Sequence, residues 1–255
     1  MYRNILVHAA DAGAVSRVRL AADLARRFDA KLIGIGAILP RDLGRDRTAE
    51  EFRLAEQQFR TAAAEYGVKV EWRRLETDPT HGLASAASAA DLVVVGRVPA
   101  GLAEDDDRAV NPAGLLMRAG RPMLIAPADA TAVAARNIVV AWKDNREARR
   151  AVTDALPLLK RAEVVSLVAI HEDDESPDLA DAVAFLTAHA VKCRVQSLQS
   201  DSTSIKCQLI NVTERAQADL IVAGGYSDIR TGEWVFSGTT HGLIESCPVA
   251  CLMSH

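Results

Sequence analysis

The chain has 255 residues, of which 49% are hydrophobic and 25% charged, and its formal net charge at pH 7 is −4. This balance is typical of a globular protein long enough for one large domain or two ordinary ones. A negative charge speaks against a nucleic-acid-binding module, because such modules carry a concentrated basic face. The amino terminus lacks a signal-peptide pattern and no apolar run is long enough to cross a bilayer, so we expect a cytoplasmic protein without membrane or nucleic-acid partners.

The first half of the chain alternates short apolar runs with helical patterns. Apolar runs predict buried strands, because the strands of a parallel sheet are covered on both faces. We expect strands at residues 4–7, 31–35, 68–75, 91–95 and 121–125. Helical periodicity predicts helices at residues 15–28, 48–66, 81–90 and 112–119. In the first helix, Arg17 and the other arginines lie largely outside the apolar face. Strands separated by helices imply right-handed crossovers and a parallel sheet with helices on both faces.

The second half repeats the first. Three segments recur in matching order: Asn4-Ile-Leu-Val7 as Asn137-Ile-Val-Val140, Asp91-Leu-Val-Val94 as Asp219-Leu-Ile-Val222, and Arg121-Pro122-Met123 as Cys247-Pro248-Val249. Between them we expect helices at residues 146–160, 179–189 and 203–217 and strands at 164–170 and 191–198. Residues 127–135 are small and polar, which indicates a linker. We therefore expect two tandem α/β domains, residues 1–128 and 136–255, each an open parallel five-stranded sheet with helices on both faces.

The most distinctive stretch lies near the carboxyl end. Gly224 and Gly225 halt a buried strand, and after a polar loop a helix is expected to begin near Thr239. A helix start beside a strand end exposes backbone N–H groups and the positive end of the helix dipole, which suit phosphate. The same residues also have explanations without a ligand. Glycines permit positive φ and close backbone approach, and threonines cap helices.

This stretch resembles the carboxyl-terminal signature of universal stress proteins, G-x-x-G, nine residues, then G-[ST]. In that family the loop and the following helix hold the phosphates of ATP or AMP. Setting Gly224 on the first glycine places Ser227 on the second and Ser237-Gly238 on the final pair, so the loop departs from the pattern. We prefer this register because it also puts Thr240 where the family often has a threonine.

A shift by one residue gives the alternative register, with Gly225, Asp228, Gly238 and Thr239 on the four positions. That shift restores the final pair but places an aspartate where phosphate would lie.

The order of elements in each half resembles the same family and its adenine nucleotide alpha hydrolase-like fold. The duplication resembles the tandem bacterial type, in which two units pack as a pseudo-dimer. The strand ending in Ala141-Trp142 is similar to second domains of that type. In ATP-holding members an acid and Gly-Ser follow this strand, close to ribose and adenine, and the matching residues here are Lys143, Asp144 and Asn145. Lys143 could reach a phosphate and Asp144 could replace the carboxylate. Alternatively, this segment is an ordinary N-cap region.

The first copy has an acidic run at residues 104–107, which would repel a triphosphate, so we expect that copy to have lost the site. The candidate cofactor-binding residues are Ala141, Lys143, Asp144, Gly224, Gly225, Ser227, Ser237, Gly238, Thr239 and Thr240. No metal-ligand spacing and no nucleophile–base pairing is visible, so no catalytic or metal residue is assigned.

The resemblance implies a non-catalytic stress-response protein whose second domain binds ATP, with Mg²⁺, or AMP. It leaves open whether the chain also forms a homodimer. The alternative is a weak ATPase or nucleotide hydrolase on the same scaffold, since fold alone does not decide between binding and turnover.

Overall fold

The structure is a computed structural model, and it describes residues 1–11, 13–39, 45–97, 108–172, 176–201, 204–226 and 238–255. The chain divides into two compact units, Met1–Val133 (unit 1) and Ala134–His255 (unit 2). This division falls inside the small, polar segment 127–135.

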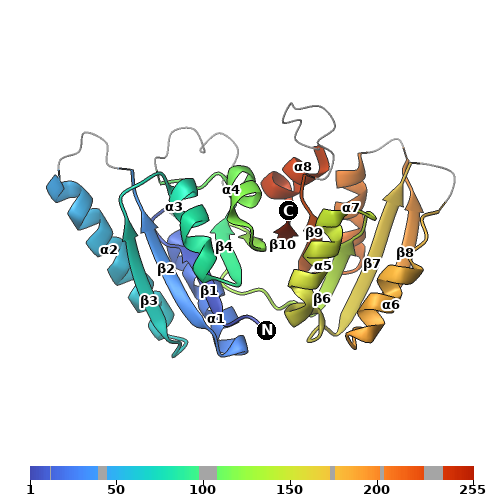
Figure 1. The fold of residues 1–255 in the computed structure, drawn as a ribbon, viewed down its shortest axis with the longest axis horizontal. Coiled ribbons are helices and arrows are strands. Elements are labelled where there is room, and N and C mark those ends of the chain that lie inside the picture. The colour runs from blue at the N-terminus through green and yellow to red at the C-terminus, as the bar shows by residue number, and fades with distance from the viewer. Residues whose placement is uncertain (12, 40–44, 98–107, 173–175, 202–203, 227–237) are drawn as a thin grey trace. The chain divides into compact units, whose positions relative to one another are not determined.

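Unit 1 is a parallel sheet whose strands are separated by helices (Figure 1). Its strands are β1 (Asn4–His8), β2 (Lys31–Ala37), β3 (Val70–Leu75), β4 (Leu92–Gly96) and β5 (Met123–Ala126). Its helices are α1 (Ala14–Phe28), α2 (Arg45–Ala64), α3 (Pro79–Ala86), the 3₁₀ turn η1 (Ala87–Ala89) and α4 (Pro112–Ala119). The strand order is β3-β2-β1-β4-β5, and each neighbouring pair is parallel.

Unit 2 has the same plan. Its strands are β6 (Asn137–Ala141), β7 (Val164–His171), β8 (Arg194–Gln199), β9 (Leu220–Gly224) and β10 (Ala250–Ser254). Its helices are α5 (Arg146–Leu159), α6 (Ala180–Ala188), α7 (Ile205–Arg215) and α8 (Gly238–Ser246). The strand order is β10-β9-β6-β7-β8, again parallel throughout. Two tandem five-stranded parallel α/β sheets were predicted, and this fold class is confirmed.

The ends of some elements differ from the prediction. The strand expected at residues 191–198 begins only at Arg194. Ala190 has a left-handed φ of 61°, and the N–H of Val191 donates to the carbonyl of Leu186 over 2.9 Å. Residue 191 therefore closes the end of α6 instead of opening a strand.

The repeated aspartates have a structural role at the amino ends of the central strands. Asp91 Oδ2 accepts the N–H groups of Arg3 and Asn4, at 2.7 and 2.9 Å. Asp219 Oδ2 accepts the N–H of Arg136 at 3.0 Å. In both units the aspartate before one central strand thus fixes the start of its neighbour. This explains why the motif recurs in both units.

Apolar residues at successive positions form the core of each sheet. Ile5, Leu6 and Val7 of β1 are fully buried, and Val139 and Val140 of β6 are as well. Such runs are expected of central strands with helices on both faces. Within the described ranges, no helix is both long and apolar enough to cross a membrane.

Candidate functional site

The carboxyl ends of β6 and β9 meet at one edge of the sheet in unit 2. The two strands are parallel neighbours, with Ala141 opposite Ala223. Beyond β9 the chain turns at Tyr226, whose φ of 57° is uncommon for a residue with a side chain. The N–H of Tyr226 donates to Thr240 Oγ1 over 3.2 Å. This bond ties the first turn of α8 to the end of β9, so the helix start and the end of β6 lie at the same edge.

Gly224 has a packing reason to be glycine. A Cβ added there would lie 2.5 Å from the backbone nitrogen of Ala148 and 2.7 Å from the carbonyl carbon of Glu147. The first turn of α5 therefore rests directly on the last residue of β9. Gly224 does not have a positive φ, so of the two explanations without a ligand, close approach is the one that applies. This glycine is required whether or not a ligand binds.

Gly225 and Thr240 form hydrogen bonds within unit 2. The N–H of Gly225 donates to the carbonyl of Ser254 over 2.9 Å, and its own carbonyl lies 3.1 Å from Nδ1 of His255. Thr240 is buried, and its hydroxyl accepts the bond from Tyr226. Gly238 differs, because it is exposed and a Cβ there would meet nothing within 4 Å. Gly238 and the half-buried Thr239 are therefore the residues of the helix start that an anion could approach.

The segment after β6 is polar and exposed. Asn145 caps α5, since its Oδ1 accepts the N–H of Ala148 at 2.8 Å, which confirms the N-cap interpretation for this residue. Lys143 and Asp144 are both exposed. Asp144 Oδ1 accepts Nη2 and Nε of Arg149, at 2.7 and 3.0 Å. The carboxylate of Asp144 is thus part of an exposed ion pair.

A cavity of about 440 Å³ lies between α5 and α6, beside the end of β6. Its apolar wall is Trp142, Val152, Leu167, Ala182, Phe185 and Leu186. Its polar groups are Asp144, Arg149, Thr153, Asp178 and Asp181. Three carboxylates and one guanidinium make the surroundings acidic, which disfavours phosphate inside the cavity. The mixture of aromatic wall and carboxylate acceptors suits an uncharged ring system that carries hydroxyl groups.

The equivalent position in unit 1 has a different chemistry. Asp11, which corresponds to Asp144, forms an ion pair with Arg17, and its Oδ2 lies 3.3 Å from His8 Nδ1. Nε of Arg17 donates to the carbonyl of His8 over 2.9 Å. Burial alone would raise the pKa of Asp11, but hydrogen bonding from His8 and the charge and hydrogen bond of Arg17 outweigh it. The pKa of this carboxyl is therefore well below its ordinary value.

The prediction that Arg17 lies outside the apolar face of its helix is wrong, because only 3% of Arg17 is exposed. Its guanidinium lies over the end of β4, where a Cβ added to Gly96 would come within 2.2 Å of Nη1. Arg17 is spaced three, four and seven residues from Ala14, Ala21 and Leu24, all buried on α1. That helical spacing was the signal for its burial.

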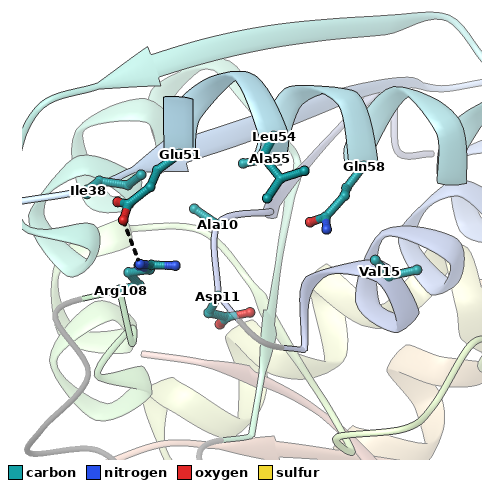
Figure 2. Close-up of a pocket in the computed structure, with 9 residues that line it drawn as sticks. All are labelled: Ala10, Asp11, Val15, Ile38, Glu51, Leu54, Ala55, Gln58 and Arg108. Carbon is teal, nitrogen blue, oxygen red and sulfur yellow. Dashed lines mark hydrogen bonds and ion pairs between the residues drawn. The ribbon is translucent and has the colours of Figure 1, made fainter. Parts of the chain in front are cut away.

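Unit 1 also has a cavity, of about 310 Å³, between the ends of β1 and β2 and the helices α1 and α2 (Figure 2). Glu51 extends from α2 toward Arg108, and its Oε1 accepts Nη2 of Arg108 at 3.0 Å. Asp11 lies on the loop after β1. Both acids of this cavity are thus paired with arginines of the same unit.

Two candidate site residues, Ser227 and Ser237, lie outside the described residues, and so do Asp228 and the acidic run 104–107. Within the described ranges, no group of three or more His, Cys, Asp or Glu residues could hold a metal ion.

Comparison with known proteins identifies the fold. No family model and no curated protein matches the chain. A universal stress protein from Archaeoglobus fulgidus DSM 4304 has 17% identity and a TM-score of 0.79, over 98% of this chain and 97% of that one. A putative universal stress protein from Pseudomonas aeruginosa UCBPP-PA14 has 15% identity and a TM-score of 0.59, over 98% of this chain and 92% of that one.

A functionally unknown protein from Pseudomonas aeruginosa PAO1 is similar to the same extent, with 15% identity and a TM-score of 0.60 over 98% of this chain and 92% of that one. These matches extend over both units. The chain therefore has the tandem fold of the universal stress proteins.

Proposed function

We propose that the chain is a tandem universal stress protein that binds an adenine nucleotide at the strand-end edge of unit 2 and does not turn it over. The observation that carries this proposal is the cavity of about 440 Å³ beside Trp142 and Asp144, at the end of β6. The cavity matches the size and chemistry of a nucleoside. The start of α8 suits an anion, because the backbone N–H groups and the dipole at a helix amino terminus attract negative charge.

We expect the base and the ribose to bind in the cavity and the phosphate to bind at the start of α8. Trp142 offers an aromatic surface for the base, and Asp144 offers an acceptor for a ribose hydroxyl. The acidic cavity would repel phosphates, which are attracted instead to the first turn of α8 at Gly238 and Thr239. The exposed ammonium of Lys143 supplies a cation at the same edge.

This arrangement refines the candidate residues. Gly224 packs against the first turn of α5, and Gly225 and Thr240 form hydrogen bonds at the end of β9. We therefore assign these three residues a structural role beside the ligand. Gly238, Thr239 and Lys143 remain the groups for phosphate. AMP suits the edge better than ATP, because each added phosphate brings more negative charge near the carboxylates of the cavity.

Calorimetric titration of AMP and ATP tests this function with a matched pair of variants. Gly238→Asp places a carboxylate at the helix start, where the open space accommodates a side chain. Gly238→Ala adds volume without charge. We expect wild type and Gly238→Ala to bind alike, and Gly238→Asp to bind AMP at least about tenfold more weakly, a difference of about 1.4 kcal/mol. Equal affinity of all three proteins would remove this helix start from the site.

The alternative function, hydrolysis, requires a positioned metal, a cation for the departing charge and an oriented water. Lys143 is one cation, but Asp144, an acid of the same edge, is paired with Arg149. We therefore expect phosphate release from ATP with Mg²⁺ to stay far below roughly 1 s⁻¹. Faster release that is abolished by Lys143→Ala in folded protein would favour the enzyme.

A further inference from the structure

Helix α6 and the residue pair before it form one wall of the cavity in unit 2. The residues of this wall recur every three or four positions, as on one face of a helix, and they are Asp178, Asp181, Ala182, Phe185 and Leu186. Ala182 and Leu186 are buried, whereas Asp181 and Phe185 are exposed. Asp181 and Phe185 are four residues apart and are therefore neighbours on the helix surface. The outer part of this wall thus places a carboxylate beside an aromatic ring.

Asp181 lies toward the same end of the cavity as Trp142. The strands β7 and β8 are parallel, so the helix between them runs antiparallel to both, and its first turn lies nearer to their carboxyl ends than its last. Asp181 is in this first turn. Trp142 directly follows the carboxyl end of β6. A ring that stacks on Trp142 can therefore present an edge to Asp181 within the same cavity.

The three carboxylates of the cavity differ in what they contact. Asp144 accepts Nε and Nη2 of Arg149. Asp178 Oδ1 accepts the N–H of Ala180 at 2.8 Å, at the start of α6. Asp181 forms neither a hydrogen bond nor an ion pair with any residue that the structure describes. Of the three, Asp181 thus has both carboxylate oxygens available to a ligand.

The side chains of the α5 wall already donate to acceptors of unit 2. Arg149 directs Nε and Nη2 at Asp144, and the hydroxyl of Thr153 donates to the carbonyl of Arg149 over 2.9 Å. On the α6 wall the polar side chains are carboxylates, which accept hydrogen bonds and do not donate them. The cavity therefore suits a ligand whose edge carries a hydrogen-bond donor.

In an adenine base the exocyclic amino group is such a donor. We propose that Asp181 selects the base by accepting a hydrogen bond from this amino group while the ring stacks on Trp142. The inference rests on the proposed function, because it requires the base to lie in the cavity. A base without the amino group leaves the carboxylate of Asp181 without a partner, and sites built to bond a polar group discriminate against ligands that lack it.

Calorimetric titration of two nucleotides tests this role of Asp181. AMP and purine riboside 5′-monophosphate differ only in the amino group. Asp181→Ala removes the acceptor at an exposed position, where the change is tolerated by the fold. Asp178→Asn is the matched control, because it removes a carboxylate of the same cavity and keeps an oxygen that can accept the N–H of Ala180.

We expect wild type and Asp178→Asn to bind AMP about tenfold more tightly than purine riboside 5′-monophosphate. Asp181→Ala should bind the two nucleotides alike, because it has lost the group that distinguishes them. An equal loss of preference in both variants would assign the selection to the charge of the cavity and overturn the role of Asp181.

The wild type alone separates this inference from the proposed function. Equal and measurable affinity for the two nucleotides would overturn the role of Asp181 and leave nucleotide binding in place. A wild type that binds neither nucleotide would overturn the proposed function together with the inference.

Discussion

Asp11 and Asp144 occupy equivalent positions in the two units, but their environments differ. Asp11 is enclosed with Arg17 and His8, and Arg17 lies over the end of β4. Asp144 is exposed and paired with Arg149 at the rim of a cavity. The two units thus share the plan of the sheet and its anchors and differ at their strand-end edges. Unit 1 places Arg17 over the end of β4 and pairs both acids of its cavity with arginines, whereas the cavity of unit 2 is larger and lies beside an exposed acid.

The largest expected difference between the units is the loss of stability when the arginine beside each aspartate is removed. Arg17→Ala leaves Asp11 enclosed without its cation, which we expect to lower the free energy of unfolding by about 3–5 kcal/mol. Arg149→Ala breaks an exposed ion pair and should cost less than about 1 kcal/mol. Urea unfolding of both variants measures the difference. Similar losses in the two would mean that the environments of the two aspartates are equivalent after all.

The same contrast predicts a difference in acid. A carboxyl whose pKa is lowered by folding contributes stability that is present above the pKa it has in the unfolded chain. This stability is lost as pH falls through the folded value. The pKa of Asp11 is lowered, so Asp11→Asn should be less stable than wild type at pH 7, with a gap that narrows below about pH 4. Unfolding curves at a series of pH values measure this gap. A gap that is constant with pH would contradict the role of the Asp11 charge.

Gly224 and Gly238, two glycines of unit 2, predict a further, smaller contrast. Gly224→Ala drives a Cβ into the backbone of α5 and should destabilise the protein by about 1–3 kcal/mol. Gly238→Ala places its Cβ in open space on the first turn of α8 and should change stability by no more than about 0.5 kcal/mol. Thermal melts without nucleotide compare them. A harmless Gly224→Ala would show that α5 does not rest on β9 as described.

Local patterns predicted most of the fold. The bounds of α4 match the prediction, because Asn111 and Pro112 give a clear start and Gly120, with φ 57°, gives a clear end. The three repeated anchors led to the two-copy plan. The later start of β8 at Arg194 was missed because the left-handed Ala190 is not a glycine, and its sequence therefore gave no stop signal.

The candidate site was less predictable, because it depends on contacts between distant segments. Nothing near Gly224 in the sequence indicates that Ala148 lies against it. The bond between Tyr226 and Thr240 likewise joins two ends of a loop. Arg17 could have been found from its helical spacing, but a charged residue was assigned to solvent. Its burial depends on the partners Asp11 and His8, which only the folded unit brings together.

We propose that the edge of unit 2 accepts a nucleotide and that the edge of unit 1 does not. Photolabelling of the intact chain with 8-azido-AMP, followed by peptide mapping, distinguishes the two edges. We expect labelled peptides from residues 137–255, including the segment around Trp142, with labelling suppressed by excess AMP and by Gly238→Asp but not by Gly238→Ala. AMP-protected labelling of peptides from residues 1–133, around Asp11 and α2, would instead place the nucleotide in unit 1.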